Sequence, residues 1–356
     1  MSDRMEITAS DEINSVDSTD PNTSIMKYGI SAVVHGSNYV TNLDFHESGN
    51  TLIMGTSNSV HLIDCKTGEE KKKVFVRTHG VGKMKYTHHE LCLILSSEKK
   101  TNDLRYLSLY DNKYLRYFRG HNAKVTSIAM SPDRDQFMSA SLDRTICLWE
   151  LNTSYPLAKL KLDDSYGNPY VAYDHSAQVV GIMCDKQVPN SLPQREIRLF
   201  DSRQMDKGPF GNIAPTNELI NAALTKAGVT DVNSQNDLLR AEWNHFEFSP
   251  DGKHILVNTS QNMVLVLNSF YCETPVAICS RGAVQGYQPP VCFSTDSKYV
   301  FSGSIDNNIQ VFDKITGGQV SCLSGLASPV NILACNPVYD MMASACVATA
   351  LWLPLI

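Results

Sequence analysis

The chain has 356 residues, of which 42% are hydrophobic and only 19% are charged, so it holds enough apolar material for a large core. Its formal net charge is −6, and six of the acidic side chains lie in residues 1–25 beside a single arginine. The remainder is therefore close to neutral, which excludes a general electrostatic attraction for nucleic acid and leaves polyanion binding to local patches.

The first segment, residues 1–27, is polar, acidic and poor in aromatic residues, and this composition predicts a disordered tail. An apolar run at 28–37 follows it and precedes the first repeated unit. We predict that this run forms the outer strand of the last sheet, because that arrangement closes the fold and removes an exposed edge. The folded domain is then expected to span residues 28–356.

A repeated pattern organises this domain. Seven times, an apolar strand ends in two aliphatic or aromatic residues followed by Asp or a residue in its place, at 62–64, 109–111, 148–150, 199–201, 266–268, 311–313 and 351–353. Successive ends lie 39 to 51 residues apart, except for 67 before the fifth. Propeller blades of four strands repeat at roughly 40–45 residues. The sequence therefore predicts an all-β fold, a single seven-bladed WD-repeat β-propeller.

The third unit is the most complete repeat. In repeats of this class, a His, a Ser, an Asp and a Trp form a buried hydrogen-bond network that joins the strands of one blade. The candidates here are His121, Ser139 (or Ser141), Asp143 and Trp149. A catalytic His–Asp pair is the alternative, but the phase of these residues with the repeat favours a structural network.

The segment 104–121, which joins the second and third units, carries four tyrosines and four basic residues. Arginine and aromatic residues are enriched in interface cores, and arginine pairs well with phosphate. We therefore predict a partner-binding surface with a basic patch that suits a phosphorylated peptide. Its candidate residues are Arg105, Tyr106, Tyr110, Lys113, Tyr114, Arg116, Tyr117, Arg119 and Lys124. Ordinary packing of the aromatic rings between blades remains an open alternative.

The long interval before the fifth unit contains an insertion at about 211–240. Thr216 or Asn217 suits a helix cap, apolar residues recur at helical spacing, and Gly228 suits a helix end. We predict a short surface helix in a loop between two blades. A tolerated loop expansion and a docking element for a partner are both open interpretations.

Motifs that would indicate catalysis or cofactor binding are not found. The ten cysteines form no C-x-x-C pair and mostly lie in apolar runs, as expected for reduced core cysteines of an intracellular protein. His88-His89 is interpreted as an exposed turn, and Lys71–Lys73 and Lys99-Lys100 as solvated loops. We expect no enzyme activity, no cofactor and no metal. A propeller enzyme, the alternative, would gather acidic or histidine side chains in its central channel.

Three patches also resemble a known family. They are Arg105 to His121, Asp206 to Phe210, and Ala343 to Cys346 together with Leu351 to Pro354. Their sequences and order resemble the WD-repeat subunit of COMPASS-type (Set1) histone methyltransferase complexes. The resemblance spans about residues 28–354, and the acidic extension, the insertion and the fifth and sixth units depart from it.

The resemblance implies a nuclear, non-catalytic adaptor that links the methyltransferase of histone three lysine four to phosphorylated RNA polymerase II and transcribed chromatin. The implied partners are a peptide of the methyltransferase or phosphatase scaffold and the phosphorylated polymerase tail, without sequence-specific nucleic acid binding or a membrane. The alternatives are an adaptor in a chromatin-associated phosphatase or transcription-termination complex, and a propeller substrate receptor outside chromatin.

Overall fold

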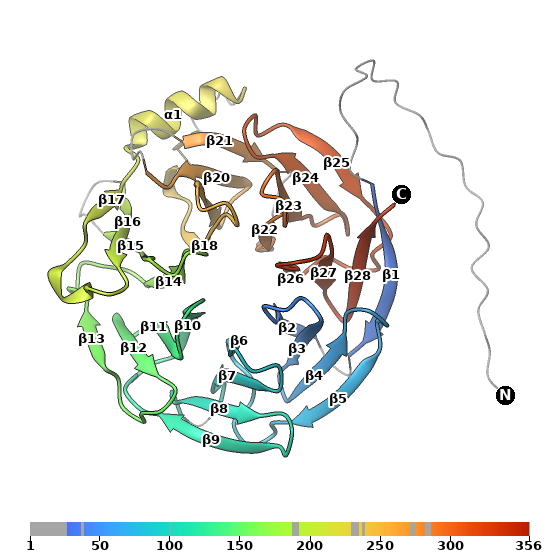
Figure 1. Ribbon diagram of the computed structural model, residues 1–356. Helices are drawn as coiled ribbons and strands as arrows, with labels where there is room; N and C mark the ends of the chain where they lie inside the picture. Colours follow the sequence, from blue (N-terminus) through green and yellow to red (C-terminus); the bar gives the residue numbers. More distant parts are fainter. Residues whose placement is uncertain are drawn as a thin grey trace, which may run out of the picture.

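The computed structural model describes residues 27–36, 39–99, 101–186, 192–228, 235–236, 239–270, 275–281 and 286–355. Within them the chain forms seven four-stranded antiparallel sheets arranged as blades around a central axis (Figure 1). The predicted seven-bladed β-propeller is thereby confirmed. The predicted disordered tail lies outside the described residues, apart from Lys27.

Each blade is a meander that runs from the central channel outward. Blade 1 comprises β2 (Val40–Phe45), β3 (Thr51–Thr56), β4 (Ser59–Asp64) and β5 (Glu70–Phe75). Blade 2 comprises β6 (Met84–Tyr86), β7 (Cys92–Ser96), β8 (Leu104–Ser108) and β9 (Lys113–Phe118). Blade 3 comprises β10 (Val125–Met130), β11 (Gln136–Ser141), β12 (Thr145–Glu150) and β13 (Ala158–Lys161). Blade 4 comprises β14 (Tyr170–Tyr173), β15 (Val179–Lys186), β16 (Gln194–Asp201) and β17 (Gly211–Ile213).

Blades 5 and 6 follow the same plan, whereas blade 7 takes its outer strand from the N-terminal end of the domain. Blade 5 comprises β18 (Trp243–Phe248), β19 (His254–Thr259), β20 (Met263–Asn268) and β21 (Pro275–Ser280). Blade 6 comprises β22 (Val291–Phe293), β23 (Tyr299–Gly303), β24 (Ile309–Asp313) and β25 (Gln319–Leu323). Blade 7 comprises β26 (Ile332–Cys335), β27 (Met342–Ala345), β28 (Ala348–Pro354) and β1 (Tyr28–His35).

The two ends of the domain meet in blade 7. Strand β1 pairs antiparallel with β28, from Tyr28 opposite Pro354 to His35 opposite Ala348. The Tyr28 hydroxyl also donates a hydrogen bond to Asp340, and its ring packs edge-on against Phe301 of blade 6. The predicted closure by an N-terminal strand is confirmed, and it leaves β28 with a partner on both sides.

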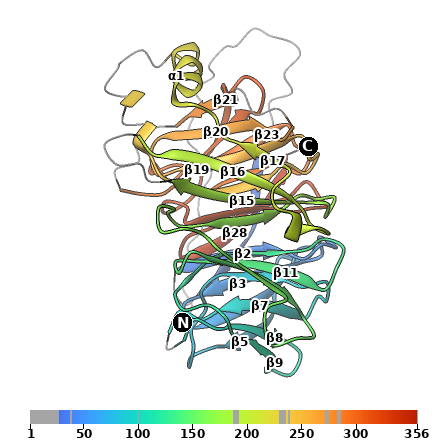
Figure 2. The same ribbon diagram turned by 90° about the vertical axis from the view of Figure 1, so that its left-hand side faces the viewer.

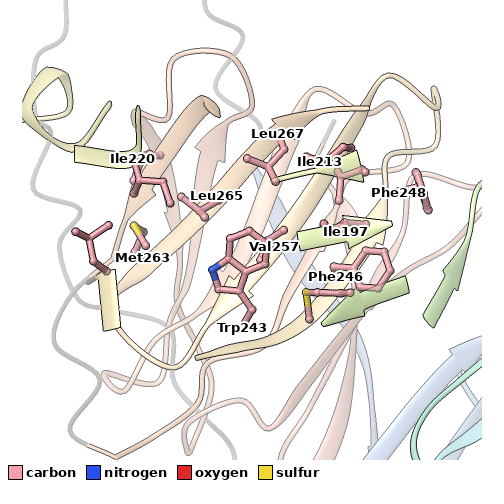
Figure 3. Packing of buried hydrophobic residues seen from close by; sticks show 14 of the residues in the cluster. Ile197, Ile213, Ile220, Trp243, Phe246, Phe248, Val257, Met263, Leu265 and Leu267 are labelled. Atoms are coloured by element: carbon pink, nitrogen blue, oxygen red, sulfur yellow. The ribbon is translucent and has the colours of Figure 1, made fainter. Parts of the chain in front are cut away.

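Apolar side chains fill the spaces between adjacent blades. Between blades 4 and 5, Ile197 and Ile213 meet Trp243, Phe246 and Leu265 (Figure 3). Sheets can approach closely here because β15 carries Gly181, where an added Cβ would lie 2.8 Å from the Phe246 ring. The core is therefore a series of inter-blade layers that surround the axis.

The long interval contains the predicted helix, α1 (Asn217–Lys226), and a short 3-10 turn, η1 (Met205–Lys207), precedes β17. The Thr216 side chain caps α1 by accepting a hydrogen bond from the Leu219 N–H. Ile220 and Leu224 are buried against blade 5, beside β21 on the outside of the ring (Figure 2). The insertion begins later than predicted, because 211–213 form the outer strand of blade 4.

Candidate protein-interaction surface

The four predicted network residues come together inside blade 3. The Nε2 atom of His121 lies 2.6 Å from Ser139 Oγ, which also accepts the Trp149 indole N–H at 2.8 Å. The other ring nitrogen, Nδ1, lies 3.0 Å from the Thr145 hydroxyl, which donates to Asp143 Oδ1 at 2.5 Å. Thr145 therefore stands between the imidazole and the carboxylate, a residue that the sequence prediction missed.

Burial and hydrogen bonds determine the charge states in this network. Burial lowers the pKa of His121, and the nearby Asp143 offsets this only in part. Burial raises the pKa of Asp143, but the backbone N–H of Asn122 and two hydrogen bonds from Thr145 outweigh it, so that the pKa of this carboxyl falls. A neutral imidazole and an ionised carboxylate, each with hydrogen-bond partners, suit a structural role that stiffens the blade.

Ser141, the second candidate for the network, makes different contacts. Its hydroxyl donates to the Ala123 carbonyl at 2.9 Å and accepts from the Asp143 N–H at 3.3 Å. It therefore orders the loop between β11 and β12 rather than joining the imidazole to the indole.

Arg105 does not lie in an exposed basic patch, contrary to the prediction. It is 1% exposed on β8 and shares a face with Leu107, which packs toward blade 1. Its guanidinium donates to Ser97 and to Thr101, and one of its nitrogens lies 3.0 Å from His79 Nδ1. Alternate residues of a strand face opposite sides, so Arg105 and Leu107 lie on the same face of β8. Arg105 is therefore buried in the interface between blades 1 and 2.

Two predicted aromatic residues cover this arginine. The rings of Tyr114 and Tyr117, on β9, lie with their centroids 5.8 and 5.7 Å from the Arg105 guanidinium carbon. Among the described residues, no carboxylate lies within ion-pairing distance of Arg105. Burial lowers its pKa, and Tyr114, the more distant Asp103 and Tyr117 partly offset this. Tyr114 and Tyr117 therefore cover the buried guanidinium and make cation–π contacts with it.

The other predicted basic and aromatic residues are spread over blade 2 and the start of blade 3. Tyr106 and Arg116 pair across β8 and β9 and are half-buried, whereas Tyr110 and Lys113 are exposed at the turn between these strands. Arg119 and Lys124 follow the other end of β9, where Lys124 forms an ion pair with Glu98 at 2.5 Å. The nine predicted residues therefore do not form one continuous patch.

Blade 1 contributes basic residues for which a solvated loop was predicted. Lys71–Lys73 instead belong to β5, the outer strand of blade 1. Lys72 reaches blade 2, where its Nζ donates to the Tyr110 carbonyl at 2.5 Å and lies 5.8 Å from that ring centroid. A run of three lysines followed by Val-Phe-Val is compatible with an outer strand that has one solvated face.

A phenylalanine on β5 is flanked by two cations. The Lys73 Nζ lies 5.3 Å and the Arg77 guanidinium carbon 4.8 Å from the Phe75 ring centroid, and this ring is half-exposed. Lys73 and Phe75 lie on the face of β5 opposite to Lys72, because Lys72 shares its face with Val74, which packs toward blade 2. The two groups therefore lie on either side of the outer edge of blade 1, and together with the residues of blade 2 described above we call them the outer basic–aromatic surface. It comprises Lys72, Lys73, Phe75, Arg77, Tyr110, Lys113 and Tyr117.

The outer strands of blades 1 and 2, β5 and β9, follow one another around the rim of the ring (Figure 1). The residues of the surface lie on or beside these strands and combine positive charge with exposed rings. Positive charge beside exposed rings favours an incoming anion, and the rings supply apolar contact area; within the surface, Lys113 also forms an ion pair with Asp111 at 3.4 Å. The arrangement therefore suits an extended acidic or phosphorylated segment.

The innermost strands use carboxylates to join blades. Asp44 on β2 accepts the Tyr86 N–H at 2.7 Å and the Lys85 ammonium at 2.6 Å, and Glu247 on β18 accepts the Phe293 N–H at 2.6 Å. In the part of the chain that the structure describes, no group of three or more His, Cys, Asp or Glu side chains is arranged to hold a metal ion. These acids of the channel wall connect one blade with the next.

The fold and sequence comparisons agree on the class of protein. A family model described as "WD domain, G-beta repeat" matches residues 112–150 and 291–313. With seven four-stranded blades and the network in blade 3, the molecule is a WD-repeat β-propeller. Within the described residues, no helix has the length and apolar character needed to cross a membrane.

Comparison with individual relatives assigns the chain to a family within this class. The chain is 33% identical to WD repeat-containing protein 82 of Drosophila melanogaster over 314 residues, which cover 88% of this chain and 89% of that protein. The chain therefore belongs to the family of WD repeat-containing protein 82.

Two yeast relatives also match most of the chain. COMPASS component SWD2 of Saccharomyces cerevisiae is 28% identical over 86% of this chain and 88% of its own length. Set1 complex component swd2 of Schizosaccharomyces pombe is 29% identical over 75% of this chain and 69% of its own length. The predicted resemblance to this group of WD-repeat proteins is confirmed.

Proposed function

We propose that the chain is a non-catalytic scaffold subunit of a Set1/COMPASS-type histone methyltransferase complex and works in the nucleus. The observation that carries this proposal is the match, along most of the chain, to relatives whose names place them in such complexes. The propeller is consistent with this proposal. Its outer strands and loops are available for contacts with other proteins, whereas the spaces between its blades are filled by packed side chains.

We further propose that the outer basic–aromatic surface binds a phosphorylated segment, such as the RNA polymerase II tail phosphorylated at serine five of its repeats. Lys72, Lys73 and Arg77 provide the positive charge, and Phe75 and Tyr110 provide exposed rings. Such a contact would link the methyltransferase to transcribing polymerase and hence to transcribed chromatin.

Membership of the complex is tested by co-expression of the full chain with the catalytic and scaffold subunits of a Set1-type methyltransferase. We expect stoichiometric co-elution on size exclusion and loss of the chain's peak at its own size. Elution of the folded chain entirely apart from these subunits would contradict the scaffold assignment.

The proposed surface is tested by fluorescence anisotropy with phosphorylated and unphosphorylated tail peptides. We expect the Lys72→Ala/Lys73→Ala/Arg77→Ala variant to bind the phosphopeptide about tenfold more weakly or worse, because it removes three positive charges that would attract the phosphate. The matched control is Lys161→Ala/Lys207→Ala/Lys253→Ala, which removes three exposed lysines from blades 3, 4 and 5. Equal weakening by both variants, or by neither, would exclude this surface.

A further inference from the structure

Two cysteine sulfurs meet between blades 6 and 7. The Sγ atoms of Cys292 on β22 and Cys335 on β26 lie 3.5 Å apart, although the residues are separated by 43 positions. The two strands are neighbours at the centre of the ring (Figure 1). Of the free cysteines in the described part of the chain, these two alone have a sulfur–sulfur contact.

The repeat explains why these two positions face each other. Cys292 stands two residues before the turn that begins at Ser294, as Glu247 stands before Ser249 and Asp44 before His46. Asp44 and Glu247 each use this position to bond the backbone of the next blade. At the interface between blades 6 and 7, the position carries a thiol instead of a carboxylate.

The partner residue on the next blade also occupies an equivalent position in the repeat. Cys335 stands one residue before the turn that begins at Asn336, as Phe293 stands before Ser294. The neighbouring contact from the Thr295 hydroxyl to the Asn336 carbonyl, at 2.7 Å, holds the two blades in this register. A position that links blades by hydrogen bonds elsewhere in the ring therefore brings two thiols together here.

The surroundings give the two thiols different access to solvent. Cys292 is 4% exposed, within the apolar layer that contains Phe301 and Trp352, whereas Cys335 is half-buried at its edge. A small oxidant therefore reaches Cys335 first, and Cys292 is placed to react with the oxidised sulfur.

We infer that Cys292 and Cys335 form an oxidisable dithiol that a peroxide converts into a disulfide between blades 6 and 7. The Cys335 sulfur attacks the peroxide O–O bond, which forms a sulfenic acid and releases one water from hydrogen peroxide. The Cys292 sulfur then attacks the sulfenic sulfur, the S–S bond forms, and the second water leaves. Two thiols are oxidised and one peroxide is reduced.

The bond requires a modest movement. A disulfide holds its sulfurs at about 2.05 Å, so the two must approach by roughly 1.5 Å, which side-chain rotation and a small shift of the innermost strands can supply. The product would join the innermost strands of blades 6 and 7, beside the blade that β1 closes. It would hold this part of the ring covalently in addition to the strand pairing.

The test treats the full chain with hydrogen peroxide, blocks remaining thiols with N-ethylmaleimide, and maps non-reduced peptides by mass spectrometry. We expect a peptide pair linked through Cys292 and Cys335, a melting temperature raised by several degrees, and reversal of both by dithiothreitol. Cys335→Ser should abolish the linked pair and the shift, whereas Cys322→Ser, which alters an exposed cysteine of blade 6, should leave both unchanged.

Two outcomes would overturn the inference. One is oxidation of Cys335 to sulfinic acid while Cys292 remains a free thiol. The other is a linked pair that involves other cysteines and persists in Cys335→Ser. Because the mapping reads the native chain directly, a variant that fails to fold does not affect the conclusion.

Discussion

Trp149 donates its indole N–H to Ser139 at 2.8 Å, across two adjacent strands of blade 3. Blade 7 repeats this relationship, since Trp352 donates to Ser344 at 2.8 Å. Both tryptophans are almost wholly buried, so each bond satisfies a donor that water cannot reach. The two blades differ because Ser139 in blade 3 also contacts His121. Ser139 therefore serves two buried side chains, whereas Ser344 serves one.

Ser139→Ala is therefore expected to lower the free energy of unfolding by about 2–3 kcal/mol, because it leaves two buried polar groups without a partner. Ser344→Ala removes one bond and should cost about 1–2 kcal/mol. Urea unfolding followed by tryptophan fluorescence measures both. Equal losses for the two variants would show that His121 contributes nothing through Ser139.

Stability should also depend on pH through the same network. Burial lowers the pKa of His121 below its ordinary value of 6.5, so the folded chain binds fewer protons there than the unfolded chain. The stabilisation is present above pH 6.5 and is lost as the pH falls below that value. We expect the free energy of unfolding to drop more steeply from neutral pH to about pH 5 in the native chain than in His121→Gln. Parallel pH profiles would contradict this assignment.

Arg105 provides a contrast between packing and binding. Arg105→Lys keeps the charge but loses the forked contacts to Ser97 and Thr101 and the two tyrosine faces, so we expect a loss of about 2–3 kcal/mol in the free energy of unfolding. Phosphopeptide affinity of the folded fraction should stay within about twofold, because the buried side chain cannot reach a ligand. The half-exposed Arg116, changed to Ala, is the control and should alter stability little. If Arg105→Lys lost much of its phosphopeptide affinity but kept its stability, Arg105 would belong to the binding surface after all.

Closure by β1 predicts a sharp boundary for truncation. Removal of residues 1–26 leaves the whole β1–β28 ladder and should preserve a soluble fold. Removal of residues 1–38 exposes the edge of β28 and removes Tyr28 from the blade 6–blade 7 layer, so we expect insoluble protein. Soluble yield and circular dichroism of the two truncations measure this. Normal folding of the shorter chain would contradict the closure.

The sequence predicted those features that repeat. Six of the seven strand ends, the closing strand and α1 could be anticipated because periodic apolar residues and turns determine them locally. The exception is β8, which ends at Ser108, before the predicted end at 109–111. The role of Thr145 could not, since a threonine at the start of a strand is common and its position between His121 and Asp143 depends on tertiary geometry.

The interaction surface was harder to predict for a related reason. Clustering along the chain suggested one patch, but alternate residues of β8 and β9 face different blades, which buries Arg105. Lys113 begins β9 and Lys124 follows its other end, so the strand separates them. Lys72 comes from a blade whose outer strand lies beside blade 2 only in the folded ring.

The scaffold role is tested most directly by purification of the tagged full chain from nuclear extract, followed by an assay of the eluate for methylation of histone three on nucleosomes. We predict an eluate that methylates lysine four, with loss of this activity when the tagged chain carries a fold-disrupting truncation of residues 1–38. Recovery of folded chain in complexes that contain no histone methyltransferase activity would contradict the account.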